Sequence, residues 1–379
     1  MPSGWKKTLT AGTLLASAAL GLPGVATAAT GGPVDLGTLP GDEYSFVAAI
    51  NAGGTMVGDS YPRDVRLRYH AAKWDAQGRI SALPTLGGEL GDAIAVNDAG
   101  VAVGWAEDAA GDRHAVRWAP DGSVTALQWA GPSDAVAISG TGVVAGGALG
   151  PQGTRVAVRW APDGTVTELA SLPGGGQVTV TGITADGTLV SGTAEDSAGT
   201  RHAVRWNGAT GVVTDLSPGN AGASAVAIND FGVIAGTITE AGQEVPVAWQ
   251  RDGRLVRLGW AAPPASARPR AINRAGVVVG SGYVEFAQDR AVRWTDRGAT
   301  VLEDARRSEA VALNAAGTAV GTVDSVAARW APDGTLTNLG TLPDGYYSQA
   351  TGIAPGGTII GQATTSGGAG QHAVYWPAS

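Results

Sequence analysis

The chain of 379 residues contains no cysteine, which excludes disulfide bridges, thiolate metal sites, cysteine nucleophiles and the cleavage site of a lipoprotein. Charged residues make up only 15% of the chain, and the 33 acidic residues outnumber the 25 lysines and arginines, for a net charge of −8. Because contacts to phosphate require a basic surface, this balance argues against binding to nucleic acid. What the chain does contain is 44% hydrophobic residues and 59 glycines, which is typical of a folded protein rich in turns.

The first residues differ in composition from the rest of the chain. Two lysines at positions 6 and 7 precede an apolar run over residues 9–25, and Ala26-Thr27-Ala28 then matches the small-residue pattern of a signal-peptidase site. A membrane anchor is the alternative, but glycine and proline interrupt the run well short of a full membrane span. We therefore expect residues 1–28 to be a secretion signal peptide, and the mature product to be secreted, extracellular and free of the membrane.

Two residue types recur along the remaining chain at nearly constant spacing. Successive members of each series lie between 36 and 46 residues apart, with a mean of about 43 residues. Tryptophan recurs at positions 74, 118, 160, 206, 249, 294, 330 and 376. Glycine recurs at positions 58, 104, 146, 192, 236, 280, 321 and 361. Two independent series in one register indicate eight copies of one structural unit.

Each unit contains four short apolar segments separated by turn residues, which predict strands rather than helices. Glycine ends the first turn in all eight units, asparagine opens five of these turns, and Ala-Pro-Asp-Gly recurs in the second turn. We expect each asparagine side chain to bond to the backbone two residues further on. The second unit illustrates the pattern with Ala93–Val96, Val101–Gly104, His114–Trp118 and Ser123–Leu127. Each unit is therefore predicted to be a four-stranded antiparallel sheet.

The ends of the chain favour a closed ring over a linear solenoid. The last unit stops soon after Trp376 and lacks its fourth strand, while Val34–Pro40 closely matches the fourth strand at Leu336–Pro343. Pairing the N-terminal strand with the last unit would complete a blade and hide its free edge. We predict an all-β fold, a β-propeller of eight blades, each with four antiparallel strands, forming one domain over residues 29–379. Seven blades are the alternative, because the seventh unit is short.

The repeat unit also resembles a known family. Ala-x-x-Ile-Asn-x-x-Gly-x-Val-x-Gly, followed by His-Ala-x-x-Trp and Leu-Gly-x-Leu-Pro, is similar to the repeats of the extracellular proteins named after a His-Ala-Phe (HAF) signature. Here the tripeptide reads His-Ala-Val at 114, 202 and 372 and His-Ala-Ala at 70, so the phenylalanine is absent. The resemblance covers residues 31–379. It implies a β-propeller-like fold in a secreted bacterial repeat protein, and it implies no catalytic residue.

Nothing in the sequence marks a catalytic, cofactor-binding or metal site. The four histidines share one position of the repeat, so we interpret them as donors to the backbone at a strand entrance. There is no calcium loop, zinc-binding helix, nucleophile elbow or phosphate loop. We expect no catalytic residue, no cofactor and no metal ion. The four histidines are His70, His114, His202 and His372.

A lysine or arginine precedes the repeat tryptophan in six units. Alternation along the strand places this cation on the face opposite the tryptophan. The series could form a basic ring that binds an anion, or it could supply ion pairs and packing between blades. The negative charge of the chain favours the second interpretation. The six residues are Lys73, Arg117, Arg159, Arg205, Arg293 and Arg329.

The loops provide the strongest indication of a binding site. Alternation places the tight turns on one rim of the ring and the variable connections on the other, where function tends to lie. Two crossings between units combine aromatic and acidic residues, and in a closed ring they would flank the same blade. Their tyrosines could stack on a sugar, grip a peptide, or cover the closure seam. The candidate ligand-binding residues are Tyr44, Tyr346, Tyr347, Asp42, Glu43 and Asp344.

Two classes of function remain open. The first is a secreted, monomeric, non-catalytic scaffold that binds an extracellular glycan, peptide or cell-surface protein through its variable rim. The second is a carbohydrate-active hydrolase or lyase with acids near the central channel, although no pair of carboxylates is marked out. Screens with polysaccharides and chromogenic glycosides, set beside glycan-array binding, distinguish these classes.

The signal-peptide pattern makes a direct prediction about the mature protein. Because the small-residue pattern ends at Ala28, the secreted product should begin at Ala29 or within a few residues of it. N-terminal sequencing of protein from the culture supernatant measures this. Secreted protein that retains Met1, or protein found only in membranes, would contradict the assignment.

Overall fold

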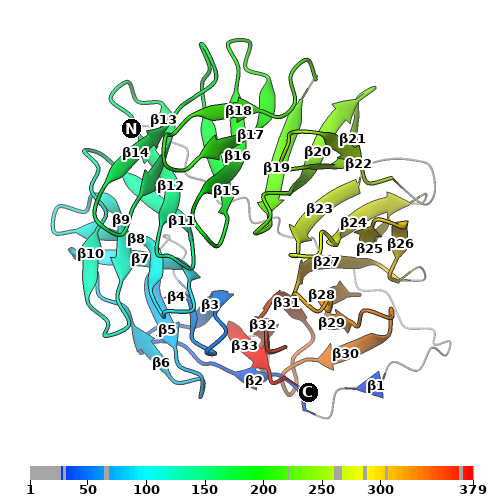
Figure 1. Cartoon of the computed structure of the whole chain (residues 1–379). Helices are drawn as coiled ribbons and strands as arrows, with labels where there is room; N and C mark the ends of the chain where they lie inside the picture. The colour runs from blue at the N-terminus through cyan, green and yellow to red at the C-terminus, as the bar shows by residue number, and fades with distance from the viewer. Residues whose placement is uncertain are drawn as a thin grey trace.

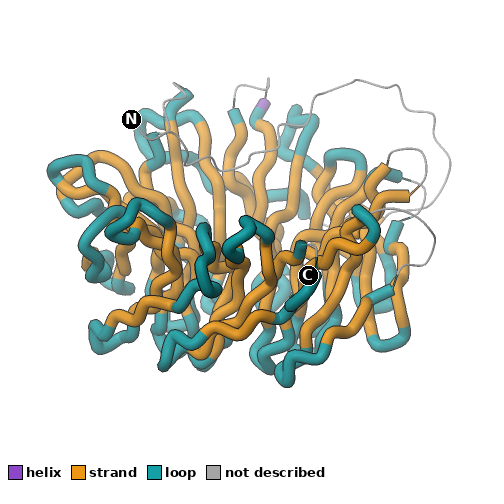
Figure 2. Tube along the Cα trace, turned by 90° about the horizontal axis from the view of Figure 1, so that it is seen from above, coloured by secondary structure: helices purple, strands orange, loops and turns teal. Residues whose placement is uncertain are grey.

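The computed structural model describes residues 27–28, 31–63, 68–220, 222–259, 267–284, 288–303, 306–366 and 370–378. Eight sheets, each containing four antiparallel strands, stand side by side as the blades of a ring (Figure 1). Seen at right angles, the strands run between two rims formed by turns and loops (Figure 2). The predicted eight-bladed, all-β propeller is confirmed, and the seven-bladed alternative is wrong. No helix in the described part of the chain is long and apolar enough to cross a membrane.

The blades follow one another along the chain, and the first four are built from consecutive strands. Blade 1 contains β3 (Tyr44–Ile50), β4 (Met56–Tyr61), β5 (His70–Trp74) and β6 (Ile80–Ala82). Blade 2 contains β7 (Gly87–Val96), β8 (Ala102–Asp108), β9 (Arg113–Trp118) and β10 (Val124–Ala126). Blade 3 contains β11 (Ser133–Ile138), β12 (Val144–Leu149), β13 (Arg155–Trp160) and β14 (Val166–Leu169). Blade 4 contains β15 (Val178–Ile183), β16 (Leu189–Glu195), β17 (Arg201–Asn207) and β18 (Val213–Asp215).

The last blade differs from the others because it takes a strand from the N-terminal part of the chain. Blade 5 contains β19 (Ala223–Ile228), β20 (Ile234–Glu240), β21 (Gln243–Trp249) and β22 (Leu255–Arg257). Blade 6 contains β23 (Ala267–Ile272), β24 (Val278–Val284), β25 (Gln288–Thr295) and β26 (Gly298–Val301). Blade 7 contains β27 (Ser308–Leu313), β28 (Ala319–Val323), β29 (Val326–Trp330) and β30 (Leu336–Gly340). Blade 8 contains β31 (Ser348–Ile353), β32 (Ile359–Thr364), β33 (Gln371–Trp376) and β2 (Val34–Asp35).

The ring closes through β2, as the sequence predicts. β2 pairs antiparallel with β33, and the N–H of Leu36 then donates to the carbonyl of Ala373 at 3.0 Å. The regular strand is shorter than the predicted Val34–Pro40, but Leu36 and Leu39 are both buried within this seam. The predicted signal peptide lies outside the described residues except for β1 (Thr27–Ala28), which pairs in parallel with β30.

The repeat tryptophan lies between neighbouring blades. All eight tryptophans are at most 2% exposed. In six blades the indole N–H also donates to a backbone carbonyl on the outer side of the preceding blade, at distances such as 2.9 Å from Trp74 to Leu36 and 2.8 Å from Trp376 to Leu339. The indole nitrogens of Trp249 and Trp330 have no such partner among the described residues. Each tryptophan therefore joins two blades by burial, and six of them also by a directional bond.

The recurrent glycine lies on the second strand of each blade, opposite a β-bulge in the first strand. In blade 8 the register shifts between Ala350 and Gly352, and the other blades shift at the same point of the repeat. A Cβ atom on Gly361 would lie 1.9 Å from the carbonyl oxygen of Gln349, and the same approach recurs in every blade. Glycine is therefore required here because the neighbouring backbone occupies the space of a side chain.

The tight turns form one rim of the ring, which we call the turn rim, and they are cross-linked by asparagine. Each asparagine accepts a backbone N–H four residues on, as Asn51 does from Thr55, and the predicted bond two residues on is found only at Asn229 among these described asparagines. Four of them also donate to the next blade's turn, as Asn51 does to the carbonyl of Asn97 at 2.9 Å. The opposite rim carries the connections between second and third strands and the blade crossings, and we call it the loop rim.

Four of the six cations before the repeat tryptophans also link the blades, through bonds to backbone carbonyls rather than the predicted ion pairs. Lys73 donates to the carbonyl of Pro120 in the next blade at 3.1 Å, and Arg117 donates to that of Gly142 at 2.8 Å. Arg205 and Arg293 bond to carbonyls of the following turns in the same way. The turns supply these acceptors because a tight turn leaves carbonyls unpaired, so the cations complete the turn rim.

The close backbone approach at the recurrent glycine predicts a large effect of a single methyl group. Replacing Gly361 by alanine should lower the free energy of unfolding by about 1–3 kcal/mol, because the bulge has to shift away from the new Cβ atom. The matched control is Gly356→Ala in the same blade, where a Cβ atom would meet nothing within 4 Å. Equilibrium urea denaturation measures both variants, and equal losses would contradict this account of the glycine series.

Candidate functional site

The six candidate residues lie on the loop rim beside blades 8 and 1. Asp42 and Glu43 belong to the crossing from β2 to β3, Tyr44 begins β3, and the other three belong to the crossing from β30 to β31. The end of β32 contacts both crossings, because Thr364 accepts the N–H groups of Tyr346 and Tyr347 while Thr365 lies beside Asp42 and Glu43. The crossings therefore flank blade 8 as predicted, with the connection after β32 between them.

The Asp42 carboxylate is committed to a contact within the protein. Its oxygens lie 2.9 and 3.1 Å from Nδ1 of His70, at the start of β5. The Asp42 side chain is only 3% exposed, while the imidazole of His70 is 37% exposed. Asp42 thus anchors the crossing to blade 1, and little of its carboxylate is left for a ligand.

Glu43 points to an open part of the loop rim. Its carboxylate lies 3.6 Å from Nε of Arg63, and both side chains are more than half exposed. Together they border a polar hollow of about 360 Å³ between blades 8 and 1. The remaining lining residues are Asp42, Thr365, Gly370 and His372. An exposed carboxylate and guanidinium at the edge of a hollow can accept and donate hydrogen bonds to a polar ligand.

Tyr44 belongs to an aromatic row across blade 1. Its ring stacks on that of Tyr61 with centroids 5.2 Å apart, and Tyr61 meets the edge of Tyr69 at 5.6 Å. Burial, followed by the nearby charge of Asp59, raises the pKa of Tyr61 to about 12. Tyr61 therefore stays a neutral phenol over the whole physiological range. Sequence reasoning missed Tyr61 and Tyr69, although the register of the first hairpin makes Tyr61 the cross-strand partner of Tyr44.

The second crossing offers one exposed ring. Tyr346 is 61% exposed, whereas the Tyr347 hydroxyl donates to Oε1 of Gln349 at 2.8 Å and burial raises the pKa of Tyr347. Asp344 is exposed and adopts a positive φ of 58° at the turn before them. Tyr346 is therefore the tyrosine of this crossing that is free to meet a ligand.

The histidines bond to carboxylates, which corrects the prediction that they donate to the backbone. His114 lies 3.0 Å from Asp108, and His372 lies 2.9 Å from Asp35 of β2. His202 lies between two carboxylates, 3.3 Å from that of Asp196 and 3.1 Å from that of Asp215. The partner acids lie at different places in different units, some at strand ends and some in loops, so the repeat pattern alone did not reveal these pairs.

A buried charged cluster between blades 2 and 3 was also missed by sequence reasoning. The Arg113 guanidinium lies 3.9 Å from the ring of Trp105, and burial lowers its pKa to about 10 despite the charges of Asp134 and Asp92. Arg155 donates to Asp134 at 2.9 Å. The positive and negative charges of this cluster offset one another, which indicates a role in packing between blades. In the described part of the chain, no group of three or more histidines and acids is placed to hold a metal ion.

Comparisons with known proteins identify the fold. No family model and no curated protein matches the chain, so the resemblance to the His-Ala-Phe repeat proteins rests on motifs alone. The Dos1 propeller is similar over 89% of this chain and 93% of its own, with 9% identity and a TM-score of 0.56. The propeller domain of the trilobed protease from Pyrococcus furiosus matches 89% of this chain and 97% of its own, with 7% identity and a TM-score of 0.51. Dipeptidyl peptidase 4 from Porphyromonas gingivalis matches 82% of this chain and 55% of its own, with 10% identity and a TM-score of 0.53. The chain folds as a β-propeller.

The pair of His372 and Asp35 makes ring closure sensitive to acid. Burial opposes ionisation of Asp35, but the hydrogen bonds from His372 and the N–H of Gly37, with the histidine charge, lower its pKa below the ordinary 3.8. Because the pKa of Asp35 is lower in the folded than in the unfolded protein, ionised Asp35 stabilises the fold above pH 3.8. This stabilisation is lost as the pH falls through the pKa of Asp35 in the folded protein. Asp35→Asn should therefore lower the melting temperature at about pH 6 and make little difference at about pH 3.

Thermal melts across this range, with the same pair of measurements in a His372→Gln background, test the assignment. Without the imidazole, the pH-dependent difference between Asp35 and asparagine should shrink. A difference that is independent of pH, or that is unchanged without His372, would contradict the role of this pair.

Proposed function

We propose that this protein is a secreted, non-catalytic β-propeller that binds an extracellular glycan, peptide or cell-surface protein through its loop rim. The observation that carries the proposal is the polar hollow between blades 8 and 1, bordered by the exposed pair of Glu43 and Arg63. Exposed side chains of opposite charge at the edge of a hollow are suited to recognition of a polar ligand.

The contrast between the two rims supports this location. Asparagine and the pre-tryptophan cations cross-link the turn rim with the same bonds from blade to blade, so most of its polar groups serve the fold. The loop rim differs from blade to blade and presents Tyr346 and the aromatic row of Tyr44, Tyr61 and Tyr69. A rigid ring that carries variable loops on one rim is the usual arrangement of a binding scaffold.

The environment of the acids argues against the hydrolase alternative at this hollow. Glycoside hydrolysis uses two accessible carboxyl groups on opposite sides of the scissile bond. Asp42 is almost fully buried against His70, so of these two acids only Glu43 is accessible. Binding without bond cleavage is the chemistry that this pair of acids supports.

The proposal includes export, a monomeric state and membership of the His-Ala-Phe repeat proteins. Export rests on the small-residue pattern that ends at Ala28, and membership rests on the repeat motifs with His-Ala-Val in place of His-Ala-Phe. The closed ring supports a monomer, because β2 covers the edge of blade 8 that would otherwise be free to pair with another chain.

A screen of glycan arrays and peptide libraries with two matched variants tests this function. The loop-rim variant carries Glu43→Gln, Arg63→Gln and Tyr346→Ala. The turn-rim control carries Asp252→Asn, Arg254→Gln and Phe231→Ala, which make the same chemical changes at exposed residues on the opposite rim. Any ligand of the wild-type protein should bind the loop-rim variant at least about tenfold more weakly, because contact residues near a hollow dominate affinity.

The control should keep wild-type affinity, and both variants should melt close to the wild-type temperature. Loss of binding only in the turn-rim control would place recognition on the turn rim and contradict the proposal. Release of reducing ends from a bound polysaccharide would favour the hydrolase instead.

A further inference from the structure

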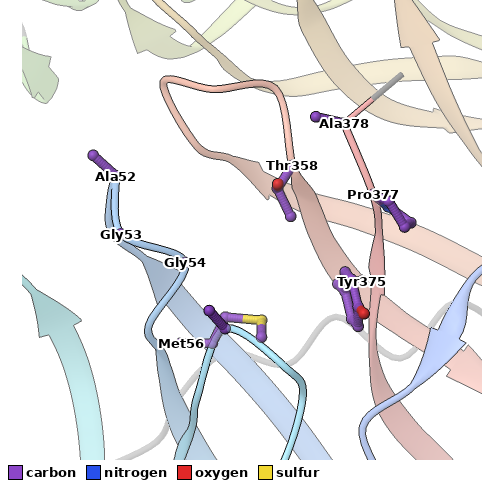
Figure 3. A pocket seen from close by; sticks show the side chains of 9 residues that line it. Ala52, Gly53, Gly54, Met56, Thr358, Tyr375, Pro377 and Ala378 are labelled. Atoms are coloured by element: carbon purple, nitrogen blue, oxygen red, sulfur yellow. The ribbon is translucent and has the colours of Figure 1, made fainter.

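The turn rim contains a second hollow, at the seam where the ring closes. It has a volume of about 400 Å³ and lies between the turns of blade 1 and the end of blade 8. Figure 3 shows Tyr375 and Thr358 of blade 8 facing Met56 and the turn at Gly54 of blade 1. No charged side chain lines it, and the residues that do are Ala52, Gly53, Gly54, Met56, Ala76, Thr358, Tyr375, Pro377 and Ala378.

The other seams of the ring show which residue of the repeat lies at the place that corresponds to this hollow. In four of them the residue before the repeat tryptophan is a cation that reaches into the next blade and donates to turn carbonyls. Arg293 uses this position most fully, donating to Pro332 at 2.8 Å, Ala331 at 3.0 Å and Gly317 at 3.1 Å. The same chain therefore builds a carbonyl-lined site for a guanidinium or ammonium group at several seams.

At the closure seam the acceptor positions remain but the cation is replaced. Gly54 ends the first turn of blade 1 as Gly317 does in blade 7, and Ala76 occupies the second-turn position of Pro332. Both line the hollow. The residue before Trp376 is Tyr375, a neutral phenol that cannot supply the missing positive charge. The hollow thus lies where, at the four seams above, a cation reaches the turns of the next blade.

We propose that this hollow binds the guanidinium group of an arginine from outside the chain. The turn carbonyls at Gly54 and Ala76 would accept its N–H groups, as their counterparts accept those of Arg293. Tyr375 adds an aromatic ring, which attracts a cation through its π face. Guanidinium fits better than ammonium because its planar fork can donate to several carbonyls at once. The net charge of −8 favours approach of a cationic ligand.

Binding is tested with N-acetyl-arginine amide as the probe and N-acetyl-citrulline amide as its neutral control of the same shape. Titration followed by amide NMR shifts should give saturable changes at Gly54, Ala76 and Thr358 with the arginine probe only. An acetylated and amidated Gly-Arg-Gly peptide distinguishes the source of the group. Tighter binding of the peptide identifies a peptide arginine, and equal binding identifies a site for the guanidinium side chain alone. Shifts that do not saturate, that lie elsewhere, or that appear equally with citrulline would overturn the proposal.

A substitution that copies the arrangement of the other blades provides an independent test. Tyr375→Arg should fill the hollow with the chain's own guanidinium, weaken binding of the arginine probe by at least about tenfold, and raise the melting temperature. The matched control is Val212→Arg, which adds the same charge to the exposed turn of blade 4 on the same rim and should bind the probe like wild type. Wild-type affinity in Tyr375→Arg would overturn the proposal, and if that variant does not fold, the NMR titration of the wild-type protein decides.

Discussion

The contact between neighbouring blades determines the rest of this structure. A four-stranded sheet has two faces, and a blade on its own would leave both faces exposed to water. Packing a tryptophan between each pair of blades buries a large apolar surface, and six indole N–H groups also bond to the preceding blade. The bulge opposite the recurrent glycine brings the first two strands of each blade together. Because every blade needs two neighbours, the stable form is a closed ring.

Closure makes one seam chemically different from the others. At the seam between blades 8 and 1, β2 returns from the N-terminal part of the chain, His372 pairs with Asp35, and Tyr375 replaces the usual cation. Both hollows of the described structure that we consider as binding sites border this seam, one on each rim. At several other seams the repeat positions make contacts of the same kind, and both hollows lie where β2 and Tyr375 change the repeat.

The candidate site shows which features of a binding site a repeat pattern can predict. Sequence spacing was enough to locate Tyr44 and Tyr346 in crossings on either side of blade 8. It was not enough to distinguish the exposed Glu43 from its neighbour Asp42, whose carboxylate is buried against His70. The difference depends on a histidine 28 residues away along the chain, which becomes a neighbour only in the folded blade. Local pattern identifies the loop, and tertiary contacts decide which of its side chains are free.

The sequence by itself determined the eight units, their four strands, the tight turns and the closing role of the N-terminal strand, because these depend on local periodicity and turn chemistry. The reason for the recurrent glycine became evident only when the bulge brought a backbone carbonyl within 1.9–2.1 Å of a Cβ position. Only the tertiary structure assigned the histidines to aspartates and the cations to turn carbonyls. These partners lie in other strands or blades, and a hydrogen bond depends on distance and direction in space, which spacing along the chain does not specify.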